Sequence, residues 1–190
     1  MVVVIPTRRT RDLHPELPED VWPGLAPLDE EVDHGRGPAA GRLIFEYGDY
    51  ECPYSRQAFQ AIEHVEQGPS VRVRFAFRHF PLVQIHPHAF GAAAAAEAAA
   101  LQECFWAMHE LLFHRQEALE DDDLRQYAYE LGLDVPRFDR DRVGADVRRR
   151  IRRDVETALA SREVRGTPTV FIDGVVYLGR YDAASLRAAL

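Results

Sequence analysis

The feature that most constrains this fold is an apolar segment that leads, through a short acidic turn, to a cysteine at the start of a helix. Leu43, Ile44 and Phe45 form the apolar run, and the chain continues as Glu46-Tyr47-Gly48-Asp49-Tyr50-Glu51-Cys52-Pro53-Tyr54-Ser55. Pro53 suits the first position of a helix, where its missing N–H would have no intrahelical partner. Cys52 would then face the unpaired N–H groups and the positive end of the helix dipole, which stabilise a thiolate over a thiol. The sequence therefore predicts a reactive cysteine at a strand-to-helix junction.

Apolar periodicity predicts regular elements on both sides of this junction. Strand, helix and strand in succession imply a right-handed parallel crossover. Asp173-Gly174, between two β-branched runs, is a strong hairpin signal. We expect strands at 42–47, 71–78, 169–172 and 175–178, helices at 53–66 and 183–190, and a helical block at about 87–163. The predicted fold is α/β, in the order β-α-β, helical insertion, β-β-α, within one domain at 41–190.

Residues 1–40 differ in composition from the remainder of the chain. Prolines at positions 6, 15, 18, 23, 27 and 38 interrupt helix and strand patterns there. We predict a loosely packed, Pro-rich N-terminal arm at 1–40.

Charge and composition exclude several classes of function. The formal net charge is -8, which argues against nucleic-acid binding and against binding to an anionic membrane. All basic residues are arginine, so mechanisms that need a Schiff-base or phosphate-loop lysine are excluded. No apolar segment reaches the length of a membrane span, and the apolar start at 1–6 is too short for a signal-peptide core. We therefore expect a cytoplasmic protein that keeps its two cysteines reduced.

Several short motifs carry a resemblance to a known family. They are Gly48-Asp49-Tyr50-Glu51-Cys52-Pro53-Tyr54, Arg78-His79-Phe80-Pro81-Leu82, His86-Pro87-His88-Ala89, Phe105-Trp106-Ala107-Met108-His109 and Gly166-Thr167-Pro168-Thr169. Over roughly residues 33–190 the chain resembles the DsbA-like branch of the thioredoxin fold, which carries a helical insertion.

The resemblance implies roles for individual residues. Cys52 would be the nucleophilic cysteine, and Pro168 would be the cis-proline that lies opposite it. Thr167 would present its backbone to an extended substrate segment, and Pro53 and Tyr54 would contact substrate beside the thiol. Ser55 stands where the family has its resolving cysteine, so the site is a Cys-Pro-Tyr-Ser variant.

This departure changes the expected chemistry. In a dithiol enzyme the second thiol expels the product from the mixed disulfide, and a serine cannot perform that step. We therefore predict a thiol–disulfide oxidoreductase of monothiol type that acts on protein or small-molecule thiols and disulfides. It would need no cofactor beyond a low-molecular-weight thiol as co-substrate, and Ser55 would hydrogen-bond to the Cys52 thiolate. Two alternatives stay open: an inactive binding module that holds peptides along Thr167 and Pro168, and a glutathione-transferase-like enzyme that activates a small thiol.

The other sulfur and imidazole groups give weaker signals. Cys104 lies at helical spacing from apolar residues, so we expect it to pack in the core rather than to resolve Cys52. His86 and His88 form a His-x-His pair without a cysteine or carboxylate at ligand spacing, so we expect no metal site.

Overall fold

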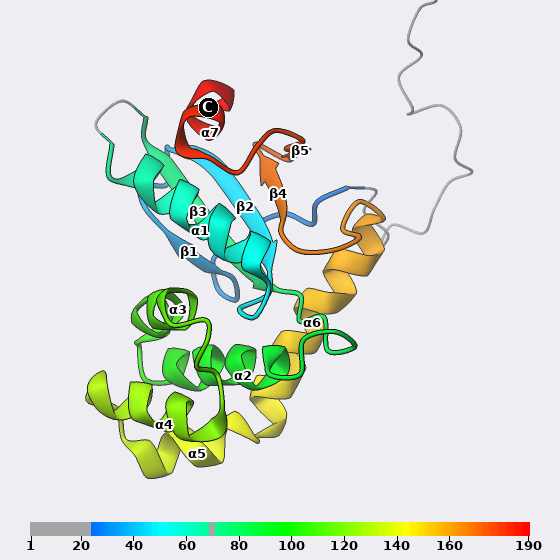
Figure 1. Cartoon of the computed structure of the whole chain (residues 1–190). Coiled ribbons are helices and arrows are strands. Elements are labelled where there is room, and N and C mark those ends of the chain that lie inside the picture. Colours follow the sequence, from blue (N-terminus) through cyan, green and yellow to red (C-terminus); the bar gives the residue numbers. More distant parts are fainter. Residues whose placement is uncertain (1–23, 69–70) are drawn as a thin grey trace, which may run out of the picture.

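The β2 strand (Arg42–Gly48) is buried on both faces over most of its length, as is typical of a central strand of a sheet with helices on each side. The computed structural model describes residues 24–68 and 71–190 (Figure 1). Its five-stranded sheet has the order β1-β3-β2-β4-β5. β2 and β3 are parallel, and the other neighbouring pairs are antiparallel. The remaining strands are β1 (His34–Arg36), β3 (Val73–His79), β4 (Thr169–Ile172) and β5 (Val175–Val176).

One face of the sheet is covered by α1 (Pro53–Glu66) and α7 (Ala183–Ala189), which lie side by side (Figure 1). As the helical spacing predicts, Phe59, Ile62 and Val65 of α1 are buried against the sheet. The other face packs on the C-terminal part of α6 (Ala145–Ser161) through Ala158. The sheet thus holds the N-terminus of α1 rigidly at the end of β2.

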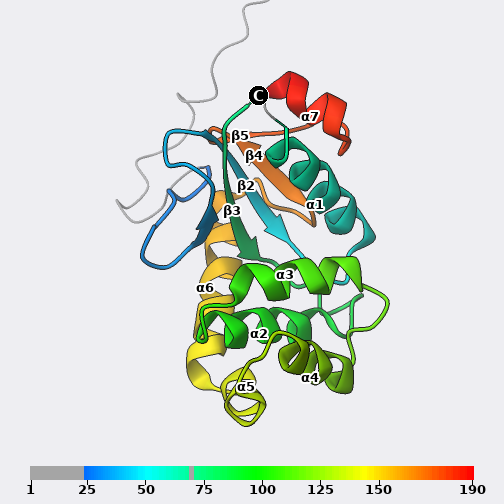
Figure 2. The same cartoon turned by 90° about the vertical axis from the view of Figure 1, so that its left-hand side faces the viewer.

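The predicted helical insertion is present as five helices between β3 and β4. Its central helix, α2 (Ala89–Ala100), is buried along almost its whole length because alanine lets the neighbouring helices approach closely. Figure 2 shows the insertion below the sheet, with α6 running from it to the sheet. The other helices are α3 (Phe105–His114), α4 (Asp121–Glu130) and α5 (Val135–Arg142). None of the described helices is both long and apolar enough to cross a membrane.

The structure corrects the expected boundary between arm and domain. β1 pairs with β3 in the main sheet, although His34–Arg36 lies inside the range predicted for the arm at 1–40. Asp33 is also buried, and its carboxylate forms an ion pair with Arg78 (2.5 Å) in which both side chains are fully buried. A strand of three residues has no periodicity to recognise, so pairing with β3 alone defines it. Residues 1–23 lie outside the described part of the chain.

Two smaller differences concern element bounds. β3 begins at Val73, two residues later than predicted, and the short helix α5 lies within the predicted helical block. β5 ends at Val176, two residues earlier than predicted. The turn at Asp173-Gly174 has positive φ at both residues (48° and 83°), as expected for a tight hairpin, and Asp182 caps α7 by accepting from the Ser185 N–H.

Candidate active site

Cys52 lies at the N-cap of α1, as the sequence predicts. Its backbone is extended (φ -78°, ψ 120°), and its side chain makes no capping hydrogen bond to the helix. Pro53 follows at the first helical position. The Cys52 residue is 4 % exposed, whereas Tyr54 beside it is 65 % exposed. The thiol thus lies just below the surface at the positive end of the helix dipole.

The loop before β4 lies against this thiol. The Thr167–Pro168 peptide bond is cis. The Cys52 Sγ–H donates to the Thr167 carbonyl oxygen at 3.2 Å, across 115 positions of sequence. The Thr167 hydroxyl is buried without a hydrogen-bond partner. The fold therefore brings Cys52 and the cis Thr167–Pro168 peptide together, with the Thr167 carbonyl next to the sulfur.

Ser55 is placed differently from the expectation. The residue is fully buried one turn into α1, and its Oγ accepts a hydrogen bond from the Asp49 N–H at 3.3 Å. The hydrogen bond of the Cys52 thiol goes to Thr167 instead. The predicted hydrogen bond from Ser55 to the sulfur is therefore absent among the described contacts.

The acidic turn before Cys52 is held by hydrogen-bond donors. Asp49 is buried, and its carboxylate accepts from the Glu51 N–H (2.9 Å), the Leu82 N–H (2.8 Å) and the His86 ring (2.8 Å). The Glu51 carboxylate accepts from the His88 N–H at 2.6 Å. These carboxylates tie the turn to the loop that precedes α2, so their charge is compensated locally.

Gln116 is a positioning residue that sequence reasoning missed. Its side-chain amide is buried and donates to the carbonyl oxygens of Tyr50 (2.6 Å) and Cys52 (2.9 Å). It follows α3 in a connecting segment and has no motif of its own, so only its position in space reveals it.

Glu46, six positions before Cys52, is a buried carboxylic acid of β2. The side chain is fully buried in β2, and neither carboxyl oxygen has a hydrogen-bond partner. Burial raises the pKa of Glu46 to about 8, so the group is mainly neutral at pH 7. The Tyr181 hydroxyl donates a hydrogen bond to the Pro168 carbonyl at 3.2 Å. Burial raises the pKa of Tyr181 to about 12, and the negative charge of ionised Glu46 adds to this shift. Glu46 therefore lies within electrostatic reach of the cis-proline loop.

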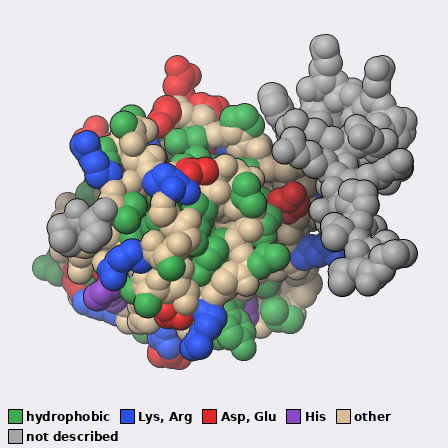
Figure 3. Space-filling view, turned by 90° about the horizontal axis from the view of Figure 1, so that it is seen from above, with side chains coloured by type: hydrophobic (Ala, Val, Ile, Leu, Met, Phe, Trp, Pro, Cys, Tyr) green, Lys and Arg blue, Asp and Glu red, His purple; other side chains and the backbone are tan. Residues whose placement is uncertain are grey.

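A groove of about 320 Å³ extends from this loop over β5. Thr167, Pro168, Val176, Tyr177 and Leu178 line it, and Leu178 is 92 % exposed. Figure 3 shows hydrophobic side chains spread over the face seen from the α7 side, interspersed with charged ones. Most of these five side chains are apolar or aromatic, so the groove offers an apolar surface beside the cis-proline.

Cys104 packs against the hydrophobic core, as expected, at the N-cap of α3. Gln116, just beyond the opposite end of α3, contacts Cys52. A helix of ten residues is about 15 Å long, so the two thiols lie near opposite ends of α3, too far apart for a direct disulfide.

A family profile described as thioredoxin matches residues 31–190. The chain belongs to the thioredoxin family. Among solved structures, a thioredoxin-like oxidoreductase from Silicibacter pomeroyi DSS-3 is 26% identical, with a TM-score of 0.72 over 83% of this chain and 90% of that one. BdbD from Bacillus subtilis shares the fold at 17% identity, with a TM-score of 0.74 over 90% of this chain and 96% of that one. These findings confirm the predicted thioredoxin-like fold and the DsbA-like resemblance.

Curated relatives of this thioredoxin-family chain carry a different name. Na⁺/H⁺ antiporter NhaA 1 of Mycolicibacterium gilvum is 44% identical over 169 residues, which are 87% of this chain and 27% of that protein. NhaA 3 of Salinispora tropica is 42% identical over 97% of this chain and 28% of its own length. This chain thus spans about a quarter of the curated relatives it matches, and the antiporter name describes those longer proteins.

Proposed function

We propose that the protein is a thiol–disulfide oxidoreductase of monothiol type, in which Cys52 forms a mixed disulfide that an external thiol resolves. The observation that carries this proposal is the contact of Cys52 Sγ with the Thr167 carbonyl, beside the cis-proline and at the N-terminus of α1. The helix end favours the thiolate, and the mainly neutral Glu46 carboxyl does not oppose it at pH 7.

The first step is attack of the Cys52 thiolate on one sulfur of a substrate disulfide. A bond forms between Cys52 and that sulfur while the substrate S–S bond breaks, and the other sulfur leaves as a thiolate with the electron pair. The thiol proton, which the Thr167 carbonyl holds in the resting state, is released to solvent or to a base before attack. The freed carbonyl is then available to a backbone N–H of the substrate.

The second step uses an external thiolate. It attacks the substrate sulfur of the mixed disulfide and forms a new disulfide with it, and Cys52 leaves as a thiolate. The net reaction exchanges one thiol for another in a disulfide, so no further oxidant or reductant is required. Cys104 takes no part in this scheme, because α3 separates it from Cys52.

We propose that the substrate lies in the groove beside Pro168. Tyr54, two residues after Cys52, and Leu178 in the groove offer exposed apolar contacts, and the Thr167 carbonyl lies next to the thiol. This arrangement favours an extended, partly apolar peptide that carries the disulfide or thiol.

The decisive experiment compares Ser55→Cys with wild type. Residue 55 lies three positions after Cys52 on α1, a spacing at which two cysteines reach the Cα separation of about 4.4–6.8 Å of a disulfide. Wild type should reduce a small mixed disulfide only when a low-molecular-weight thiol is supplied. Ser55→Cys should form an internal disulfide and gain insulin reduction with a dithiol reductant.

Three variants serve as controls for this experiment. Cys52→Ser should abolish both activities, whereas Cys104→Ser should leave both unchanged. Ser55→Ala removes the hydroxyl without adding a thiol and should keep the monothiol reaction. The enzyme proposal fails if wild type shows no activity and Ser55→Cys forms its disulfide but is also inactive. The competing function, a peptide-binding module at Thr167 and Pro168, would then be the better account of the protein.

The site of action is a further part of the proposal. We propose that the protein acts in the cytoplasm, as expected from the sequence, because low-molecular-weight thiols are abundant there and would keep Cys52 reduced.

We also propose that the antiporter-named relatives contain a thioredoxin-like unit in the quarter of their length that matches this chain.

A further inference from the structure

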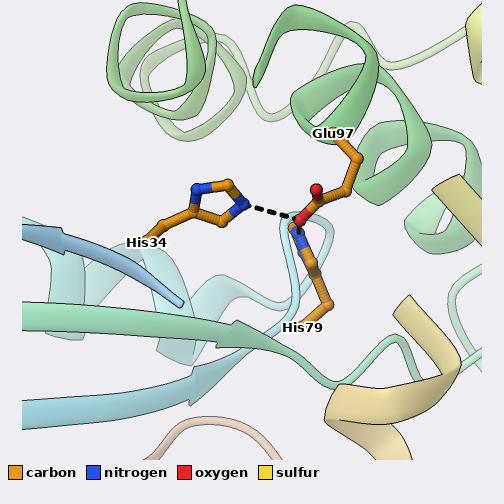
Figure 4. Close-up of side chains that lie close together, drawn as sticks. All are labelled: His34, His79 and Glu97. Carbon is orange, nitrogen blue, oxygen red and sulfur yellow. Dashed lines mark hydrogen bonds and ion pairs between the residues drawn. The ribbon is translucent and has the colours of Figure 1, made fainter. Parts of the chain in front are cut away.

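A cluster of one carboxylate and two imidazoles lies where three elements of the fold meet (Figure 4). His34 of β1 and His79 of β3 both direct their Nε2 atoms at the same oxygen, Oε1 of Glu97 on α2, at 2.8 and 2.7 Å. The three candidate ligand atoms all lie within 4.8 Å of one another. We propose that His34, His79 and Glu97 bind a divalent transition-metal ion, with Zn²⁺ as the ion that fits them best.

The ligand types select the kind of metal. Neutral imidazole nitrogens suit zinc and its neighbours in the first transition series, whereas calcium and magnesium prefer oxygen ligands. Two histidines and one glutamate are a known zinc ligand set that leaves a fourth position for a water or another small ligand. The cluster therefore favours Zn²⁺ with an open coordination position.

The distances require only a small adjustment. Ligands bound to zinc at about 2.0–2.2 Å in a tetrahedron lie about 3.3 Å apart. The Glu97 oxygen now lies 2.8 and 2.7 Å from the two nitrogens, so each contact would have to open by about 0.5 Å. Side-chain rotation of Glu97 on α2 supplies such a movement without a change in the backbone.

Packing already holds both rings in orientation. The His34 ring stacks on Phe105 with centroids 3.4 Å apart and an interplanar angle of 10°. The His79 ring is 1 % exposed and meets Phe77 edge-on at 5.4 Å. Ligands whose orientation is set before the metal arrives lose little entropy on binding.

The cluster is also accessible from solvent. His34 and Glu97 line a cavity of about 290 Å³ together with Val32, Leu101 and Arg150. The His34 side chain is 16% exposed, so an ion can approach from this side. The same cavity has room for the water that would complete the coordination.

Arg150 sets the limit on affinity. Its Nε lies 4.0 Å from Oε1 of Glu97, and its positive charge opposes that of the metal. The same guanidinium forms an ion pair with Asp154, which compensates part of the charge. Replacement of Arg150 by a neutral residue should therefore tighten metal binding, an effect that a simple hydrogen-bond cluster would not show.

The test is calorimetric titration of the full chain with Zn²⁺ in a Cys52→Ser/Cys104→Ser background, which removes both thiols as competing ligands. We expect one ion per chain, and Co²⁺ should give the intense visible absorption of a tetrahedral site. His34→Ala should weaken binding at least tenfold, and Arg150→Gln should strengthen it. His88→Ala removes a histidine of the His-x-His pair and is the matched control; it should leave binding unchanged.

Two further readouts separate ligand loss from misfolding. His34→Gln keeps a hydrogen-bond donor toward Glu97 but removes the imidazole, so it should fold and still lose the metal. Zn²⁺ should raise the melting temperature of the Cys-free protein but not that of His34→Gln. The proposal is overturned if no saturable binding occurs, or if His88→Ala weakens binding while His34→Gln does not. Neither outcome bears on the thiol reaction, because Cys52 is absent from these variants.

Discussion

Glu46 should make the stability of this protein fall as pH rises, because its carboxyl is buried in the sheet without a partner. Neither oxygen accepts or donates a hydrogen bond within the described structure, and burial raises its pKa from 4.5 to about 8. In the unfolded chain the same carboxyl is exposed and titrates near its ordinary value. The folded state therefore binds one more proton than the unfolded state over the interval between these two values.

The sign and size of the effect follow from proton linkage. Below about pH 4.5 the carboxyl is protonated in both states, and it contributes no pH dependence. Between about 4.5 and 8 the free energy of unfolding should fall by up to about 1.4 kcal/mol per pH unit, which sums to ~5 kcal/mol as an upper order of magnitude. Above about pH 8 the group is ionised in both states, and this contribution becomes constant.

The assay is urea denaturation of wild type and Glu46→Gln from pH 5 to pH 9. The amide cannot ionise, so the variant should gain stability relative to wild type as pH rises, whatever constant offset the substitution adds. Glu117→Gln, which changes an exposed side chain of 85% relative accessibility, is the matched control and should run parallel to wild type. A difference between Glu46→Gln and wild type that stays flat from pH 5 to pH 8 would refute the reasoning.

Four other substitutions test the packing of the fold and the groove beside the site. Asp33→Ala should lower the free energy of unfolding in urea by about 3–5 kcal/mol, because it leaves the fully buried Arg78 guanidinium without its carboxylate. A decrease of less than about 1 kcal/mol would show that this ion pair does not determine stability. Gln116→Leu removes the two hydrogen bonds to the Tyr50 and Cys52 carbonyls, so it should lower the melting temperature of the protein and the alkylation rate of Cys52. An unchanged alkylation rate would show that Gln116 contributes to stability alone and does not position Cys52. Leu112→Ala should lower the free energy of unfolding by about 2–5 kcal/mol, because it leaves a cavity in the core. Leu178→Ala changes an exposed side chain, so it should leave the free energy of unfolding within about 0.5 kcal/mol of wild type and weaken peptide binding in the groove. Equal unfolding midpoints for the two variants would count against the assigned core.

Signals carried by neighbouring residues made much of the fold predictable. Pro53 marks the start of α1, Asp173-Gly174 marks the hairpin and Asp182 marks the start of α7, each through the conformation of a few adjacent peptide units. The apolar periodicity of α1 likewise reports which face it buries. The N-cap position of Cys52 belongs to the same class, since a helix N-terminus is a local feature.

The family resemblance placed Thr167 and Pro168 beside Cys52, but only the tertiary structure decided which polar groups of the molecule pair with one another. The sequence contains Ser55 three residues from Cys52, yet the hydrogen bond of the thiol goes to Thr167, 115 positions away. His34 and Glu97 are separated by 63 positions and meet only because β1 joins the sheet above α2. Such contacts depend on how strands pair and helices pack, and neither leaves a periodic signal in the sequence. The sequence by itself thus determined the main elements and the placement of Cys52 at a helix N-terminus, while packing determined that Glu46 is mainly neutral at pH 7 and which group accepts the hydrogen bond of the thiol.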